Sequence, residues 1–252
     1  EVEITSASIG FVNERQKVEI SLKKLLEQDE AFSLGMNEEW KNITFGLFAA
    51  EQLTASDGTS IPADGLMETI GIDENGNAVF TTDIPCGASL YVQEIGTDDH
   101  YILSDKKSPV VFEYAGQDVA KVENEANDGE AIENTLKRGK VSGWKVDQDG
   151  FELGGAVIGL FRFDETEFTE ETALMVTESN EIGYFEFDNV PAGNFLVREI
   201  ASPEAFVLTE EIFPVETTED GQTIEITIEN QIIKGTAETI NCLLYTSPSP
   251  RD

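Results

Sequence analysis

Two sets of three residues have types that could form an amide cross-link, and the types occur in the same chain order in both sets. Each set holds a lysine, then a glutamate, then an asparagine, and the sets are Lys24, Glu94 and Asn134, and Lys145, Glu199 and Asn230. A lysine in an apolar interior is driven toward its neutral, nucleophilic form, and a carboxyl group buried beside it is driven toward its protonated form. Such a pair can attack an asparagine carboxamide, expel ammonia and leave an amide bond without a cofactor.

Alternation along short runs predicts that these lysines and asparagines point into a core. Val18, Ile20 and Leu22 share one strand face with Lys24, which leaves Lys23 to the solvent. Alternating isoleucines precede the asparagine of the second set in the same way. A buried lysine–glutamate ion pair beside a hydrogen-bonded asparagine, without any covalent bond, is the alternative interpretation.

The chain contains two copies of one unit. Five motifs occur twice in the same order. Phe-Gly-Leu-Phe (45–48) matches Ile-Gly-Leu-Phe (158–161), Asn-Gly-Asn-Ala-Val-Phe (75–80) matches Ile-Gly-Tyr-Phe-Glu-Phe (182–187), and Ile-Pro-Cys-Gly (84–87) matches Val-Pro-Ala-Gly (190–193). Val-Gln-Glu-Ile (92–95) matches Val-Arg-Glu-Ile (197–200), and Ile-Glu-Asn occurs at 132–134 and at 228–230. Ordered repeats of this kind indicate repeated structural units. We therefore expect a first domain at 14–135, with longer loops, and a second at 136–231.

One spacing recurs where the units meet. The last asparagine of a unit and the first lysine of the next lie eleven residues apart, as in Asn13 and Lys24, Asn134 and Lys145, and Asn230 and position 241. We therefore interpret 1–13 as the last strand of a preceding repeat and 232–241 as the first strand of a following one. Asn13 would then be cross-linked to a neighbouring repeat that this sequence lacks. Residues 242–252 read like a translated transposase-type sequencing adapter, and position 241 would then be Lys or Asn in the natural gene.

The strand pattern predicts an all-β chain of tandem antiparallel β-sandwiches. Short alternating runs such as Tyr184–Phe187 and Ile224–Ile228 are separated by turns rich in Asp, Asn and Gly. The exception is the segment from Leu22 to Phe32, whose leucine spacing suits an amphipathic helix. We expect a strand through Lys24 there, followed by a helical turn in an insertion.

Composition excludes several classes of partner and fold. Lys and Arg number 16 against 50 Asp and Glu, and the net charge of −34 argues against nucleic acid and against an anionic membrane surface as partners. No run is long and apolar enough to insert into a membrane. The hydrophobic content of 40%, with 15 Phe, is too high for a disordered chain, and two Cys are too few for a disulfide scaffold.

The residues for turnover catalysis or metal binding are sparse. His100 is the one histidine, so a serine or cysteine triad has no suitable base. Cys86 follows Ile-Pro at the start of a strand, where we expect a small buried residue rather than a nucleophile. The Asp-rich turns at 73–77 and 147–150 lack the spacing and terminal glutamate of a calcium loop. We therefore expect no cofactor, no metal and no enzyme activity beyond a single self-reaction in each unit.

Four motifs resemble the prealbumin-like Cna-B or SpaA-type domains of Gram-positive surface proteins. They are Gly-Trp-Lys-Val-Asp (143–147), Leu-Gly-Gly-Ala-Val-Ile-Gly-Leu-Phe (153–161), Val-Pro-Ala-Gly-Asn-Phe-Leu-Val-Arg-Glu-Ile (190–200) and Ile-Glu-Asn (228–230). The resemblance covers nearly all of 1–241 and implies a prealbumin-like, reverse-immunoglobulin sandwich closed by an isopeptide bond. It implies bonds from Lys24 to Asn134 and from Lys145 to Asn230, with Glu94 and Glu199 as proton shuttles. The first unit departs from the pattern, with Lys-Lys-Leu-Leu (23–26) where the second has Lys-Val-Asp.

The resemblance also implies a function. It indicates a structural stalk or pilin-like scaffold of a bacterial cell-surface adhesin, extracellular and anchored to the cell wall by a segment outside this sequence. Its partners would be neighbouring repeats of the same chain and, in the wider assembly, a host matrix protein or glycan. The alternative is an adhesin module that itself binds collagen or a glycan, which would need a groove on the first unit's loops around 25–42 and 97–128.

Overall fold

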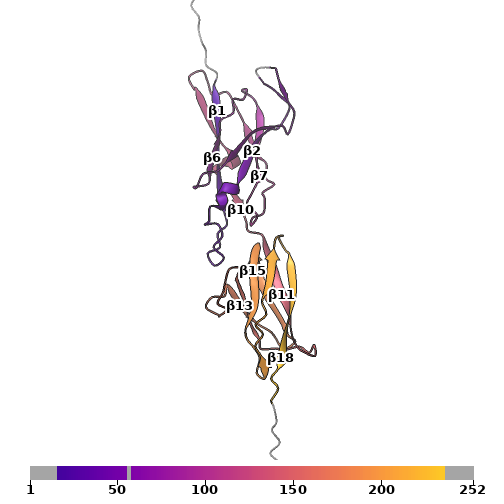
Figure 1. Cartoon of the computed structure of the whole chain (residues 1–252). Helices are drawn as coiled ribbons and strands as arrows, with labels where there is room; N and C mark the ends of the chain where they lie inside the picture. Colours follow the sequence, from indigo (N-terminus) through magenta and orange to yellow (C-terminus); the bar gives the residue numbers. More distant parts are fainter. Residues whose placement is uncertain (1–15, 56–57, 236–252) are drawn as a thin grey trace, which may run out of the picture. The chain divides into compact units, whose positions relative to one another are not determined.

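The computed structural model describes residues 16–55 and 58–235 (Figure 1). Nearly all of its regular structure is β-strand, as predicted, and two short 3₁₀ turns, η1 (Glu39–Asn42) and η2 (Ala126–Gly129), are the helical elements of this part of the chain. Within the same residues no helix is long and apolar enough to cross a membrane. The flanking segments at 1–13 and 236–241, with Asn13, and the adapter-like segment at 242–252 lie outside the described residues.

Two facing sheets and one small hairpin are built from the first half of the chain. One sheet has the order β10-β1-β6, with β9 also paired to β1, and the other has the order β5-β2-β7-β8. The strands are β1 (Lys17–Leu26), β2 (Thr44–Ala49), the hairpin pair β3 (Leu53–Thr54) and β4 (Ser60–Ile61), β5 (Leu66–Gly71), β6 (Asn77–Phe80), β7 (Ser89–Gly96), β8 (Ser108–Val111), β9 (Lys121–Glu125) and β10 (Ile132–Asn134).

Strand β1 organises the first of these sheets. It pairs antiparallel with β6 but parallel with β9 and with β10, so the sandwich is antiparallel apart from these two pairings. The register of β1 with β10 sets Lys24 opposite Ile132 and Leu26 opposite Asn134. The first and last strands of the unit are therefore neighbours, and they bring a lysine and an asparagine to the same end of the sheet.

The structure corrects the expectation for the segment from Leu22 to Phe32. Strand β1 continues past Lys24 to Leu26, and the predicted helical turn is instead a tight turn closed by the bridge between Asp29 and Leu34. The reason is that Leu22, Lys24 and Leu26 alternate toward the interior while their backbone groups pair with β6 and β10. Ladder hydrogen bonds on both sides of the strand outweigh a helical spacing of leucines.

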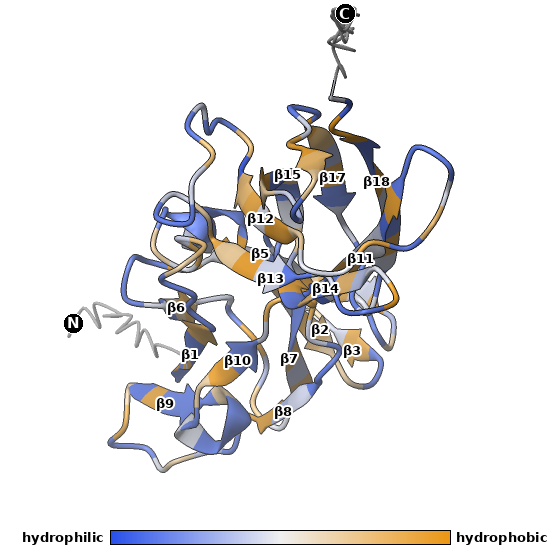
Figure 2. Cartoon of the chain, turned by 90° about the horizontal axis from the view of Figure 1, so that it is seen from below, coloured by the Kyte–Doolittle hydropathy of each residue, from blue (hydrophilic) through white to orange (hydrophobic). Residues whose placement is uncertain are grey.

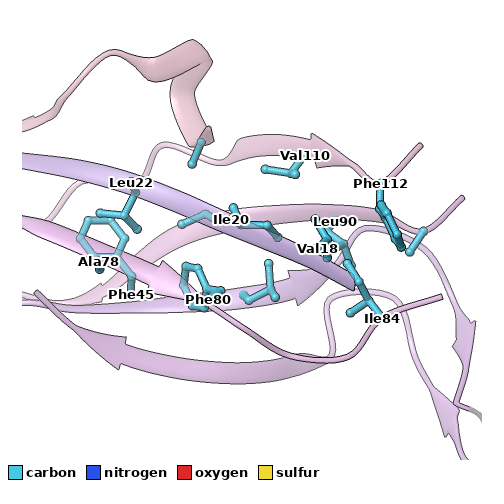
Figure 3. Close-up of a cluster of buried hydrophobic side chains, with 14 of the residues drawn as sticks. Val18, Ile20, Leu22, Phe45, Ala78, Phe80, Ile84, Leu90, Val110 and Phe112 are labelled. Carbon is cyan, nitrogen blue, oxygen red and sulfur yellow. The ribbon is translucent and has the colours of Figure 1, made fainter. Parts of the chain in front are cut away.

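The core of the first unit lies between its two sheets. Apolar side chains of β1 such as Ile20 and Leu22 meet others such as Phe45, Phe80 and Leu90 in one buried cluster (Figure 3). Each fully buried side chain of this size stabilises the fold by about 1.5–3 kcal/mol relative to exposure. Figure 2 shows the matching hydropathy pattern, with hydrophobic segments on the strands and mainly hydrophilic loops.

The second half of the chain forms two further sheets with equivalent strand order. Their orders are β14-β11-β18-β16 and β13-β12-β15-β17, so β11 lies between β14 and β18 as β1 lies between β6 and β10. The strands are β11 (Arg138–Asp147), β12 (Val157–Arg162), β13 (Met175–Glu178), β14 (Tyr184–Pro191), β15 (Gly193–Ala201), β16 (Phe206–Val207), β17 (Phe213–Thr217) and β18 (Thr223–Ile232). The fold is therefore a tandem of β-sandwiches, and the domain boundaries at 135 and 231 stay predictions.

Candidate cross-linking site

The first predicted set of residues forms one buried triad. Lys24 comes from β1 and Asn134 from β10 of one sheet, while Glu94 comes from β7 of the facing sheet. Lys24 Nζ lies 3.4 Å from each carboxylate oxygen of Glu94. The Asn134 side-chain amide donates to Glu94 Oε1 at 2.8 Å. The glutamate thus contacts both the lysine and the asparagine across the core.

The second set repeats this arrangement. Lys145 on β11, Glu199 on β15 and Asn230 on β18 occupy the equivalent strands. Lys145 Nζ lies 3.7 Å from Glu199 Oε1 and donates to the backbone carbonyl of Ile228 at 3.2 Å. Asn230 Nδ2 donates to the same Glu199 Oε1 at 2.9 Å. All six residues predicted from the sequence therefore lie in the two groups to which the sequence assigned them.

Burial sets the electrostatics of both triads. None of the six residues is more than 2% exposed, and a phenyl ring, that of Phe45, lies 5.8 Å from Lys24 Nζ. Burial lowers the pKa of Lys24 and of Lys145 below the ordinary lysine value of 10.5, although the negative charge of the facing glutamate opposes the shift. Each amine is therefore closer to its neutral, nucleophilic form than a surface lysine is.

Each glutamate is held by a backbone group that the sequence did not point out. The N–H of Ser104 donates to Glu94 Oε2 at 3.0 Å, and the N–H of Thr209 donates to Glu199 Oε2 at 3.1 Å. Both donors stand ten positions after their glutamate, directly after the matching triplets Tyr-Ile-Leu (101–103) and Phe-Val-Leu (206–208). That repeat is the signal that could have found them. In both units the other oxygen, Oε1, accepts from the asparagine.

The carbonyl oxygen of each asparagine side chain is unusual. Oδ1 of Asn134 and Oδ1 of Asn230 are buried and accept no hydrogen bond. A buried acceptor without a donor costs about 1–3 kcal/mol, so folds seldom retain one without a reason. The carbon that carries this oxygen is the atom that a neutral amine attacks in amide exchange. Each triad therefore holds an amine, a carboxyl group and a carboxamide together in the interior.

A glycine places the backbone of each lysine. Gly76 and Gly183 stand at the same place in the repeat, and both have positive φ angles, of 78° and 76°. The backbone N–H of Lys24 donates to Gly76 O at 2.7 Å, and that of Lys145 donates to Gly183 O at the same distance. A Cβ atom at Gly76 would lie 2.2 Å from Lys24 O, and one at Gly183 would lie 2.4 Å from Lys145 O. Only glycine allows this approach.

The other residues that the sequence singled out lie elsewhere. Cys86, expected to be buried, is exposed, because Ile84 and Ala88 on either side of its turn fill the interior instead. His100 pairs with Asp98 at 2.5 Å rather than with a triad residue. Among the residues that the structure describes, no group of three or more His, Cys, Asp or Glu side chains is arranged to hold a metal ion.

Comparison with known proteins supports the fold. Residues 139–232 match the family model described as the SpaA prealbumin-like fold domain, while no curated protein matches the chain. The TIE protein of Bacillus anthracis superposes with a TM-score of 0.60 at 18% identity, over 86% of this chain and 34% of that one.

Two pilus proteins are more distant in structure. The C-terminal fragment of the pilus adhesin SpaC from Lactobacillus rhamnosus GG gives a TM-score of 0.48 at 12% identity, over 87% of this chain and 99% of that one. A streptococcal ancillary pilin gives 0.35 at 16% identity, over 88% and 64%. The chain thus spans about a third of the TIE protein and under two thirds of the ancillary pilin. The family match and the β-sandwich geometry agree, and residues 139–232 are similar to the SpaA prealbumin-like fold domain.

Proposed function

We propose that the chain is a load-bearing piece of a bacterial surface stalk or pilin-like scaffold. In this proposal each unit closes itself with one amide bond, between Lys24 and Asn134 and between Lys145 and Asn230. Each unit reacts once and turns over no substrate. The match to the SpaA family and the duplication of the unit support the scaffold role, and the location that follows is extracellular and anchored to the cell wall.

The reaction consumes an amine and a carboxamide and releases ammonia. The neutral lysine Nζ attacks the asparagine Cγ, and the electron pair of the C=O bond moves to Oδ1. The glutamate carboxyl group transfers a proton from the attacking nitrogen to Nδ2 in the course of the step. The Cγ–Nδ2 bond then breaks, ammonia leaves, and the carbonyl re-forms as a secondary amide. Holding the groups in contact takes the place of a bimolecular collision, so no cofactor is needed.

The observation that carries this proposal is the repeated triad with its unpartnered carbonyl oxygen. If the lysine–glutamate pair were purely structural, the fold would be more stable with both the N–H and the C=O groups of the asparagine side chain hydrogen-bonded. Instead, both units leave Oδ1 without a donor, and in both burial lowers the pKa of the lysine. The same arrangement in both units favours a reaction over a local packing accident.

Intact mass tests the proposal directly. Each bond removes one ammonia, about 17 Da, so the chain should be lighter than its sequence by two such losses. Glu199→Ala should leave one loss and Glu94→Ala the other, because each variant removes only its own proton carrier. Glu229→Ala and Glu133→Ala are matched controls, since these exposed carboxylates precede the two asparagines and should change nothing. A wild-type chain of full mass would refute the cross-links, and the unaffected bond in each variant reports that the chain still folds.

A further inference from the structure

The carboxamide of Asn134 has a second partner that its counterpart lacks. Its Nδ2 donates to Glu94 Oε1 at 2.8 Å and also to the hydroxyl oxygen of Thr97 at 2.9 Å. Thr97 stands three residues after Glu94, directly after β7 ends at Gly96. In a regular strand, residues three apart face opposite sides, so Glu94 and Thr97 should not reach the same group.

A β-bulge explains how both reach it. Along the β2–β7 ladder, Phe45 pairs with Glu94 and Thr44 pairs with Gly96, so Ile95 is the extra residue. An extra residue shifts the alternation by one position, so each side chain after the bulge points to the face opposite to the one that a regular strand would give it. Bulges occur beside active sites because they redirect side chains in this way. Ile95 turns outward and is 40% exposed, while Glu94 is buried. The bulge therefore aims the hydroxyl of Thr97 at the carboxamide.

A threonine hydroxyl can donate as well as accept, and this matters for the reacting form of the amide. Rotation of the Asn134 carboxamide by half a turn about its Cβ–Cγ bond exchanges Nδ2 and Oδ1. After the rotation, Oδ1 lies between Glu94 Oε1 and the Thr97 hydroxyl. The hydroxyl can donate to it, and the Glu94 carboxyl group can donate once it carries the proton taken from the amine. Negative charge develops on this oxygen when the amine attacks, and donors aimed at such an oxygen are among the strongest contributors to catalysis.

The second unit has a hydroxyl at the same place but uses it differently. Ser202 also stands three residues after its glutamate, and its hydroxyl donates to the backbone carbonyl of Phe206 at 2.9 Å. That bond occupies its one proton, and the carboxamide of Asn230 donates to Glu199 instead. The two units thus share the triad and differ in this one donor.

We propose that Thr97 is a catalytic residue of the first unit, donating its hydroxyl to Asn134 Oδ1 as Lys24 attacks. This rests on the proposed cross-linking function. The hydroxyl stabilises the oxyanion and keeps its own proton throughout. Glu94 takes the proton of the attacking amine. Rotation of the tetrahedral intermediate about Cβ–Cγ then returns Nδ2 to Glu94, which delivers that proton to it, and ammonia leaves as the carbonyl re-forms. Thr97 lowers the barrier of the step without altering its products.

The rate of bond formation tests this inference. The chain is made by cell-free synthesis, quenched in acid at intervals, digested, and the linked peptides of each unit are quantified by mass. Thr97→Val should slow the first-unit bond by about a hundredfold, the usual loss of one oxyanion donor, and Thr97→Ser should restore it. The second-unit bond in the same molecules is the internal reference, and its rate of formation should be unchanged. Ser202→Ala is the matched control, and it should leave the rate of the second bond within about threefold because that hydroxyl does not contact the amide.

The outcomes separate the two proposals. If the wild-type first unit forms its bond and Thr97→Val forms it at the same rate, the role of Thr97 is refuted while the cross-linking function stands. If the wild type forms no first-unit bond, the proposed cross-linking of the first unit is refuted, and the proposed role of Thr97 is refuted with it. Thr97→Ala serves as the second variant should valine disturb the fold. The unfolding midpoint of each variant is also measured with Asn134→Ala added, so that no first-unit bond can form. A purely structural role of Thr97 would lower this midpoint, and Thr97→Ser and Thr97→Val would then form the bond at the same rate.

Discussion

At the scale of single residues, both lysines lie in the buried interior, where the charged form of an amine is unfavourable. Burial lowers the pKa of Lys145 below 10.5, with the charge of Glu199 opposing the shift. In the unfolded chain the same amine keeps its ordinary pKa and therefore holds its proton to higher pH. Between the two pKa values the unfolded state binds more protons, so the stability of the unreacted fold rises with pH across that window.

This gives a pH prediction for an unreacted second unit. In Asn230→Ala the second bond cannot form, and the free energy of unfolding should rise as pH increases through the lowered pKa of Lys145 toward 10.5. Urea unfolding at several pH values measures it. The double variant Lys145→Met, Asn230→Ala lacks the amine and should lose that rise while keeping any slope from other groups. An identical pH profile in both variants would show that Lys145 is not the source.

Sequence alone found the triad residues but not their second partners. Alternation from Val18 to Lys24 and the repeated Ile-Glu-Asn were enough to turn both lysines and both asparagines inward, because strand geometry has a fixed period of two. Thr97 was not found, since its direction depends on a bulge at Ile95 and the alternation rule places it on the wrong face. The backbone donors at Ser104 and Thr209 were missed as well. Any residue has an N–H to donate, and only the repeated triplets before these two residues mark their positions.

At the scale of elements, the turn glycines Gly76 and Gly183 fix the position of each lysine strand. Gly183→Ala should both destabilise the second unit and slow its proposed bond, because the new Cβ would lie 2.4 Å from Lys145 O and must displace β11 or the turn that holds Gly183. We expect about 1 kcal/mol from the positive φ angle and a further ~1–3 kcal/mol from the overlap. Unfolding midpoints and the mass loss of the second unit measure the two effects.

The matched control for this change is in the same unit. Gly150 also has a positive φ angle, of 83°, but a Cβ there would meet nothing within 4 Å. Gly150→Ala should therefore cost only the backbone strain and leave the second bond at its normal rate. Equal effects of the two substitutions would mean that the close approach of Gly183 to Lys145 has no role in placing the amine.

The strands could be predicted where a local alternation of residues marks them, but not where their bounds or pairing depend on a distant strand. The short alternating runs and their Asp- and Gly-rich turns gave the all-β class and the sandwich. The parallel pairing of β1 with β10 joins residues over a hundred positions apart, and no local pattern encodes it. The extension of β1 to Leu26 was missed for a related reason: Leu22, Leu25 and Leu26 fit a helix as well as a strand, and only pairing with a distant strand decides between them.

At the scale of the whole molecule, the position of the proposed bonds decides what they would do mechanically. Within each unit they would link the first and the last strand, so pulling on the ends of a unit would load the bond before the sheets. A closed loop of this size also removes unfolded-state entropy worth about 4–5 kcal/mol, by the relation used for disulfides. The charge of −34 keeps such a chain solvated, and amide bonds do without the oxidising chemistry that disulfides need.

Force spectroscopy on the whole chain tests this load path. With both bonds formed, pulling on the two ends should give no lengthening step from either unit, since the force bypasses each sandwich. In Glu199→Ala the second unit is free to unfold, and the 85 positions from Lys145 to Asn230 should add about 300 Å of contour length at ~3.3–3.6 Å per residue. The first unit of the same molecule should still give none, which is the internal control, and Glu229→Ala should behave as the wild type. A step of similar length from the wild-type chain would mean that the linked residues do not carry the load.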